Sequence, residues 1–348
     1  MVSKHSSRWP ERARRTLRES ATAVPWGGMT TSAQSRDDVR RGLTAAARTA
    51  HAAGDWQGSY AGFTAASSLG PLDTEDLAAL AIAARRLGRL AESTRLAELV
   101  FTRYARRDPV LAGEQATELA LAWLTRGDRV SARGWIQRAR ALTDGAGPGS
   151  GYLAYLEVSI LADEHRVDDA TAGTDELAAL DDLLANPAVR ALTLVARGRL
   201  ALADDRADAG HRLLAQALAG ADDPRVPIEW AGEVYGTALR HLRRDGELAT
   251  SARGADAMDR WCERLGLGGL YRGWASHARG VVAVRTGAHR RAVEALSAAL
   301  CEYRVLQPHR DVADAYEWRM MAHRSLGDSA AAEADSATAA AIRRLLGE

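Results

Sequence analysis

The chain has 348 residues, with 46 basic and 45 acidic side chains and a formal net charge of +1. A balance this close excludes attraction of the whole protein to DNA or to an anionic membrane through bulk charge. Lys4 is the single lysine, which excludes a Walker-type phosphate loop, a Schiff-base lysine and a kinase lysine within the fold.

The cysteine content and the apolar runs predict a protein of the cytoplasm. Cys262 and Cys301 are too few for a disulfide framework and match no metal-ligand spacing. The longest alanine-leucine stretch, around Leu77 to Ala84, falls short of the 18 or more apolar residues of a membrane span, and no apolar segment follows Lys4 as in a signal peptide. We expect no metal, no cofactor, no membrane and no export.

Residues 1–35 differ in composition from the rest of the chain. They are rich in arginine and then run through a glycine- and serine-containing stretch, which predicts a basic, flexible N-terminal arm. An arm that binds nucleic acid or an acidic partner is the alternative. A short helix can begin at Pro10, and Met29 is a second candidate for the start of the chain.

From residue 36 onward the pattern is typical of one helix after another. Alanine, leucine, arginine and glutamate dominate, aromatic residues are 5%, and apolar residues recur at intervals of three and four. Eight short breaks divide this region, and successive breaks are 34, 39, 38, 39, 42, 41 and 40 residues apart. The breaks are Gly54-Asp55, Gly88-Arg89, Gly127-Asp128, His165-Arg166, Asp204-Asp205, Gly246-Glu247, Gly287-Ala288 and Gly327-Asp328.

Each break is followed by a local pattern that suits the second helix of a tightly packed pair. A glycine provides a left-handed turn and a following aspartate can cap the next helix. Small residues come five and twelve positions later, as in Ala132 and Ala139, Ala292 and Ala299, and Ala332 and Ala339. We therefore predict an all-α fold over residues 36–348: a right-handed superhelical solenoid of about eight tetratricopeptide-like (TPR-like) helix pairs, with a joint near residues 144–151.

Several short strings of the repeats resemble a known family. The chain is similar to the helical-repeat region of actinobacterial LuxR-type transcriptional regulators and related cyclase- and ATPase-linked regulators, over roughly residues 37–340. The resemblance implies a sensory or partner-binding module. With one lysine and no helix-turn-helix after the last repeat, it does not imply nucleotide hydrolysis or DNA binding. The strings are Asp55-Trp56, Gly70-Pro-Leu72, Glu75-Asp-Leu77, Leu87-Gly-Arg89, Arg126-Gly-Asp128, Gly134-Trp135 and Arg260-Trp-Cys-Glu263.

The common catalytic signatures are missing from the sequence. It has no paired histidines at metalloprotease spacing, no Cys-x-x-Cys and no Gly-x-Ser-x-Gly. The glycines between 145 and 151 do not match the dinucleotide fingerprint and read as a loop. Acidic doublets such as Asp181-Asp182 read as helix caps or solvated surface.

The inner helix of each pair is expected to line a concave groove. Positions thirteen, ten, six and three residues before a break should project into it. The mixed charge and aromatic surface at these positions favour a peptide or a small polar ligand. Ion pairs along the stack, and tryptophans that fill the core, are the alternative reading. The predicted groove residues are Tyr152, Tyr155, Glu233, Arg240, Arg243, Trp274, His277, Asp314, Glu317 and Arg324.

The sequence therefore favours a non-catalytic recognition module, regulatory by resemblance, that binds a partner protein, a peptide or a small ligand. The alternative is a TPR-fold enzyme of a biosynthetic pathway, in which His277 acts as acid or base beside Glu233 or Glu317. An alanine-rich last helix also leaves a surface that a second copy could cover in a homodimer.

Overall fold

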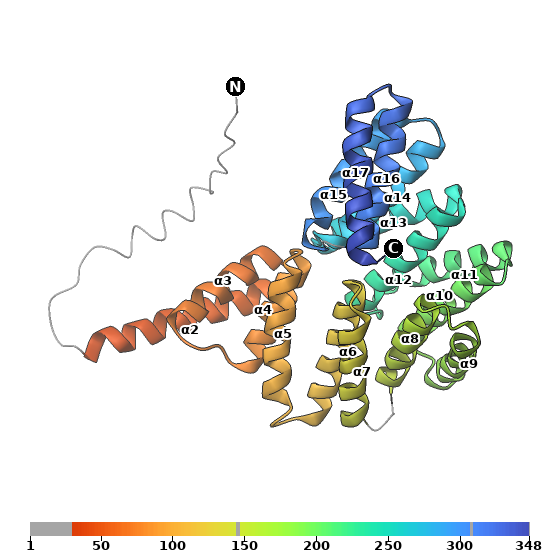
Figure 1. The fold of residues 1–348 in the computed structure, drawn as a ribbon. Coiled ribbons are helices and arrows are strands. Elements are labelled where there is room, and N and C mark those ends of the chain that lie inside the picture. The colour runs from red at the N-terminus through yellow and green to blue at the C-terminus, as the bar shows by residue number, and fades with distance from the viewer. Residues whose placement is uncertain (1–29, 144–146, 307–308, 348) are drawn as a thin grey trace, which may run out of the picture.

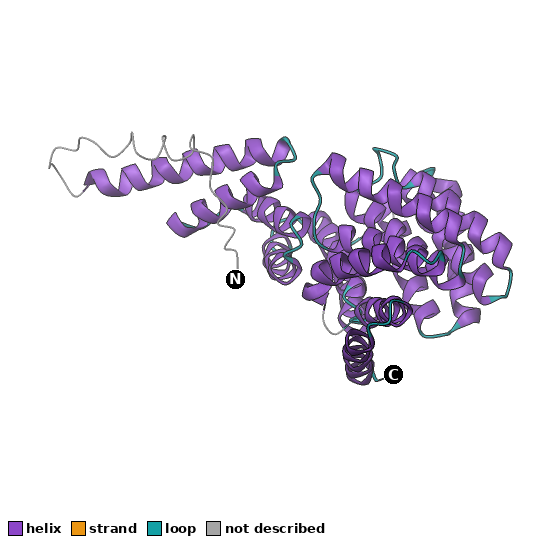
Figure 2. Ribbon diagram, turned by 90° about the horizontal axis from the view of Figure 1, so that it is seen from above, coloured by secondary structure: helices purple, strands orange, loops and turns teal. Residues whose placement is uncertain are grey.

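The computed structural model describes residues 30–143, 147–306 and 309–347, and the regular secondary structure of this part of the chain is all helical (Figures 1 and 2). It forms sixteen α-helices and one short 3-10 helix, with no strand among the described residues. The all-α prediction is confirmed. Residues 1–29 of the predicted arm lie outside the described residues, whereas residues 30–35 belong to the first helix.

The helices are short and follow one another with brief connections. In chain order they are α2 (Thr30–Ala52), α3 (Trp56–Leu69), α4 (Thr74–Arg86), α5 (Leu90–Tyr104), α6 (Pro109–Thr125), α7 (Arg129–Leu142), α8 (Pro148–Asp163), α9 (Val167–Leu184), α10 (Pro187–Ala203), α11 (Ala207–Gly220), α12 (Ile228–Asp245), α13 (Leu248–Leu265), α14 (Leu270–Arg285), α15 (His289–Glu302), η1 (Tyr303–Leu306), α16 (Arg310–Ser325) and α17 (Ser329–Leu346).

Every predicted break is a turn with one residue in the left-handed backbone region. Glycine takes this conformation without a steric penalty, because it has no Cβ to meet the following carbonyl. His165 and Asp205 take it in the two breaks that lack glycine, each with φ of 58°. The six glycines are Gly54, Gly88, Gly127, Gly246, Gly287 and Gly327, with φ between 72° and 83°.

Acidic residues cap the helices that follow several of these turns, as predicted. Asp55 accepts a hydrogen bond from the Gly58 amide at 2.9 Å, and Asp128 accepts one from the Ser131 amide at 2.9 Å. A side-chain oxygen at this position satisfies one of the amides that has no partner inside the helix. The capped turns therefore separate the helices at the positions that the sequence marks.

Consecutive helices pack as antiparallel pairs, from α2 with α3 to α16 with α17, in a pattern that fits a repeat arrangement. The small residues predicted at the pair contacts are buried, since a larger side chain there would overpack the helices. These residues are Ala132, Ala139, Ala292, Ala299, Ala332 and Ala339.

The buried apolar residues form two clusters. The smaller one lies within α2–α5 and includes Phe63 and Leu80, and the larger one extends from α6 to α17. At the predicted joint near residues 144–151, α8 already begins at Pro148, and the larger cluster continues across the joint from Ile136 to Leu153. The two clusters adjoin at α5, whose Leu90 and Phe101 pack against the larger one.

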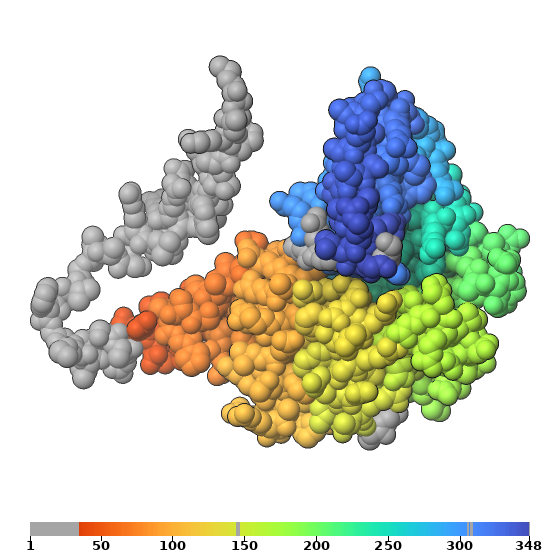
Figure 3. All heavy atoms as spheres, in the orientation of Figure 1, coloured from red at the N-terminus to blue at the C-terminus, as the bar shows by residue number. Residues whose placement is uncertain are grey.

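The chain coils so that α2–α5 meet a loop more than 170 residues later. The Trp56 indole Nε1 donates to the Leu265 carbonyl at 2.7 Å, and the Gly268 amide donates to the Arg86 carbonyl at 2.9 Å. Figure 1 shows α12 near the centre of the described chain, and in Figure 3 the orange N-terminal helices lie below and to the left of the blue C-terminal helices. We call this contact between the α4–α5 turn and the α13–α14 loop the seam.

Two glycines allow the backbones to approach at the seam. A Cβ at Gly88 would lie 2.8 Å from the Gly269 Cα, and one at Gly269 would lie 2.5 Å from the Gly88 Cα. Both distances are shorter than van der Waals contact, so neither position accepts a side chain without movement of the other backbone.

Of the helices in the described ranges, none is long and apolar enough to cross a membrane.

Substitution of Gly88 by alanine tests the seam. Gly287 has nearly the same backbone, with φ of 77° against 78°, but its Cβ would meet nothing within 4 Å. Both alanine variants should lose about 1–2 kcal/mol of unfolding free energy from the left-handed backbone. Gly88→Ala should lose about 1–3 kcal/mol more from overpacking. Urea unfolding measures both losses, and equal losses would show that the seam contributes nothing.

Candidate functional site

A buried carboxylate joins three of the inner helices, α12, α14 and α16. Asp311, in the first turn of α16, has a side chain that is 2% exposed. It accepts a hydrogen bond from Arg243 Nη2 at 2.7 Å, two from Arg240 at 3.2 and 3.3 Å, and one from Trp274 Nε1 at 3.1 Å. We call these residues, together with those that contact them below, the buried charge network.

The electrostatics of Asp311 follow from its cationic neighbours. Burial alone would raise the pKa of the Asp311 carboxyl, but the Arg240 and Arg243 guanidinium groups hold it well below its usual range. The position in the first helical turn also favours a negative charge, since amide dipoles point toward it. His309, the N-cap residue of α16, accepts a hydrogen bond from the Asp311 amide through Nδ1 at 3.1 Å.

His277 extends the network toward η1. Its ring is fully buried, with Nδ1 lying 3.3 Å from the Tyr303 hydroxyl and Nε2 lying 3.5 Å from an Asp314 carboxylate oxygen. Asp314 is also 3.3 Å from Arg243. Burial, reinforced by the charge of Arg243, lowers the pKa of His277 well below its ordinary value. The ring is therefore neutral at physiological pH and serves as a packed polar contact between α14 and α16.

A second polar group lies on α8 and α12. The buried Tyr155 hydroxyl donates to Glu233 Oε1 at 2.7 Å, and the Thr237 hydroxyl donates to the same oxygen at 2.8 Å. Burial and the neighbouring Glu233 raise the pKa of Tyr155 well above its ordinary value, so the phenol stays protonated and donates. Glu233 thereby connects the inner face of α8 with that of α12.

A pocket lies next to these polar groups and to the seam, between α4–α6 on one side and α12 and α14 on the other. Its cavity volume is about 40 Å³, and the pocket is partly open to solvent. The lining residues are Arg85, Leu90, Ser93, Thr94, Leu121, Ala122, Thr125, Arg126, Glu229, Glu233, Leu270, Tyr271 and Trp274.

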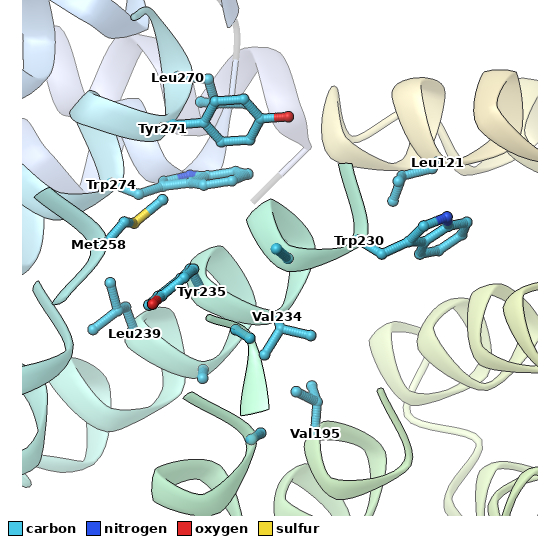
Figure 4. Packing of buried hydrophobic residues seen from close by; sticks show 14 of the residues in the cluster. Leu121, Val195, Trp230, Val234, Tyr235, Leu239, Met258, Leu270, Tyr271 and Trp274 are labelled. Carbon is cyan, nitrogen blue, oxygen red and sulfur yellow. The ribbon is translucent and has the colours of Figure 1, made fainter. Parts of the chain in front are cut away.

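The aromatic wall of the pocket depends on two glycines of α12. A Cβ at Gly232 would lie 2.2 Å from the Tyr271 ring, and one at Gly236 would lie 2.6 Å from the Trp274 ring. These glycines leave the room in which the two rings pack against α12. Figure 4 shows Tyr271 and Trp274 on α14 and Leu121 on the facing helix across the space between them.

Charged groups around the pocket fall into paired and unpaired sets. Arg86 donates to Glu229 at 2.7 Å, and although burial alone would raise the pKa of Glu229, Arg86 and Arg85 lower it. The Arg85 side chain makes no hydrogen bond or ion pair within the described residues, although, against the lowering effect of burial, Glu118 and Glu229 raise the pKa of its guanidinium. Burial raises the pKa of the nearby Glu118 to about 6, so this carboxyl is partly protonated near neutral pH.

The structure brings together five of the ten predicted groove residues and separates the others. Arg240, Arg243, Trp274, His277 and Asp314 meet in the buried charge network.

The other five predicted residues lie outside this network. Tyr155 pairs with Glu233, Tyr152 stacks on Trp230 with ring centroids 4.2 Å apart, Glu317 binds Arg343, and Arg324 is exposed. Among these contacts, the Glu317–Arg343 pair matches the ion-pair alternative, and a ligand-binding role for the ten stays a prediction.

Sequence reasoning missed Asp311, which organises the network, and Arg85, which lines the pocket. Asp311 lies three residues before Asp314 on the same face of α16, one turn beyond the four positions considered. Arg85 stands in the last turn of α4, three residues before the Gly88 break, where the same spacing rule would have included it. Tyr271 lies three residues before Trp274, again on the same helical face.

Comparison with known proteins adds nothing to this description. No protein-family model matches the chain, and no curated protein aligns with it significantly. The resemblance to regulator repeat regions therefore rests on the quoted strings alone.

Replacement of Asp311 by asparagine tests the buried charge network. The variant keeps the shape of the side chain but leaves Arg243, which is 1% exposed, without its closest anion. Removal of one partner from a buried ion pair costs about 3–5 kcal/mol, so we expect a loss of that size in unfolding free energy by urea titration. The control is Asp222→Asn, since Asp222 pairs with Arg264 at the surface and should lose little. Similar losses in both variants would contradict the network.

The neutral ring of His277 predicts a pH dependence of stability. Its folded pKa lies below the unfolded value of about 6.5, so stability is present above pH 6.5 and is lost as the unfolded chain takes up a proton at lower pH. Between pH 7.5 and 5.5 this loss amounts to about 1.4 kcal/mol. His277→Gln should therefore reduce the fall in unfolding free energy over this interval by that amount. An unchanged fall would show that the ring is not held neutral.

Proposed function

We propose that the chain is a TPR-type superhelical solenoid of about eight helix pairs that works as a non-catalytic recognition module. In this proposal it binds a segment of a partner protein or a small polar ligand on the inner side of the coil. The repeat period, the left-handed turn at each break and the packing of consecutive helices support the solenoid.

The observation that carries the proposal is the pocket next to the seam. Its walls come from four parts of the chain that are distant in sequence, and they combine guanidinium and carboxylate groups with aromatic and aliphatic surface. Concave sites of this composition are typical of ligand binding, because apolar walls provide contact area while a few polar groups fix orientation. Two of the predicted groove residues, Glu233 and Trp274, line it.

The chemistry of the site favours binding over catalysis. His277 was the candidate acid or base, and its ring is buried, neutral and absent from the pocket lining. A general acid or base must reach its substrate within hydrogen-bond distance. Glu233 reaches the pocket but already accepts two hydrogen bonds.

The biological setting follows from the resemblance. We propose a regulatory role in the cytoplasm, without direct contact of the repeats with DNA. A bound ligand would bridge α4–α5 and α12–α14 and so alter how the two ends of the coil meet. Pairing of two copies through α17 also remains a prediction.

A variant that fills the pocket tests the proposal. Ala122 lines the pocket on α6, and Ala122→Phe should occupy the space with a phenyl ring. Thermal shift measurements against libraries of short peptides and small polar molecules should identify a ligand that stabilises the parent protein. Ala122→Phe should lose that stabilisation.

The matched control is Ala179→Phe, because Ala179 is exposed on α9, away from the pocket. Circular dichroism should show equal helix content in all three proteins. If the identified ligands bind Ala122→Phe with the same affinity as the parent protein, this pocket is not their binding site. No binder in either library would count against the recognition function itself.

A further inference from the structure

The pocket contains an arginine whose donors are unused. We propose that Arg85 anchors the carboxylate of a monoanionic ligand whose apolar body lies against Leu121, Tyr271 and Trp274. This inference rests on the proposed function and narrows it to one class of ligand: carboxylic acids with an aliphatic or aromatic body, either free or as the C-terminus of a peptide.

The first argument is the contrast between two neighbouring arginines at the end of α4. Arg86 is buried and binds Glu229 at 2.7 Å. The Arg85 side chain also lines the site, but within the described residues it makes no hydrogen bond and no ion pair. A guanidinium group carries five N–H donors in a rigid planar fork, which matches the two oxygens of a carboxylate. In this pocket Glu118 and Glu229 act on the group electrostatically, but its N–H donors have no acceptor within the described residues.

The second argument is the charge that remains after internal pairing. Glu229 forms an ion pair with Arg86, whereas Glu233 accepts hydrogen bonds from the uncharged hydroxyls of Tyr155 and Thr237 and forms no ion pair within the described residues. Arg126, whose guanidinium lies over the Trp123 ring at 4.8 Å, also lines the pocket and has no ion pair in the described ranges.

Arg85, Arg86 and Arg126 therefore face three carboxyls, Glu118, Glu229 and Glu233, so the charges around the pocket are nearly balanced. A monoanion disturbs this balance less than a dianion does. A dianion such as a phosphate monoester would meet the negative charge of Glu118 and Glu229 at short range, in a site where water screens charges poorly.

The third argument is the composition of the walls beyond Arg85. Leu90, Leu121 and Leu270 contribute aliphatic surface, and Tyr271 and Trp274 contribute two rings that meet edge to face, with centroids 6.1 Å apart. Apolar area of this kind contributes binding energy in proportion to the ligand surface that it removes from water. A ligand that is polar throughout would leave this surface unused.

Calorimetric titration of the full chain with matched probes tests the inference. The probes are 4-phenylbutyrate, the corresponding primary amide, the corresponding amine and the phosphate monoester of 4-phenylbutanol. A second set is the peptide Ala-Ala-Leu-Phe with a free or an amidated C-terminus, which separates a free acid from a peptide end as the source of the carboxylate. We expect at least one of the two carboxylates to bind about tenfold or more tightly than its amide, as a charge-assisted pair predicts.

Variants of the anchor complete the test. Arg85→Gln should bring the acid down to the affinity of the amide. Arg85→Lys, which keeps the charge but not the fork, should retain part of the difference and covers the case in which Arg85→Gln folds poorly. Arg95→Gln is the control, because Arg95 is exposed on α5 and does not line the pocket. It should bind like the parent protein.

Three results would overturn the inference. These are equal binding of acid and amide, tighter binding of the amine or the phosphate monoester, and no binding of either carboxylate. In each case the proposed function survives if another ligand found in the library screen is lost in Ala122→Phe. Loss of the carboxylate preference and failure of the recognition function are thus separate outcomes.

Discussion

The ion pair between Asp311 and the two arginines of α12 is the interaction on which the inner face of the C-terminal half depends. A carboxylate removed from water is stable only where several donors surround it, and here Arg240, Arg243 and Trp274 supply them from two other helices. These donors require one relative position of α12, α14 and α16. The same position places Trp274 and Glu233 at the pocket, so the buried network shares Trp274 with the pocket and helps to determine its geometry.

The seam, unlike the buried charge network, joins its two sides through few contacts. Helices α2–α5 have their own small apolar cluster. They meet the α13–α14 loop through hydrogen bonds and the close approach of Gly88 and Gly269, and they meet α12 through the Arg86–Glu229 ion pair. Contacts of this kind are specific in geometry but remove little apolar surface from water. The pocket lies across the boundary between the two clusters. A ligand held there would add contacts to both sides, which gives the proposed module a physical means of responding to occupancy.

The predicted groove explains both the success and the limit of sequence reasoning at the site. Counting back from each break identified the correct helical face, because Arg240, Trp274, His277 and Asp314 do meet one another. The prediction of an open surface depended on the radius of the coil, and no local pattern encodes that radius. Asp311 and Arg85 were missed because the count stopped one turn short at Asp311 and was not applied to the break at Gly88.

The sequence by itself determined the elements: the all-helical class, the positions of the eight turns and the small residues at the pair contacts. These features follow from short-range effects, namely backbone preference, capping and the 3.6-residue period, which act within a few residues of the chain. Only the tertiary structure decided that Trp56 would reach Leu265, that Gly88 would meet Gly269 and that the inner charges would pair with one another. Such contacts depend on small rotations between successive helix pairs. Because those rotations accumulate along the coil, partners about 70 to 200 residues apart come together without any signal in the sequence near either of them.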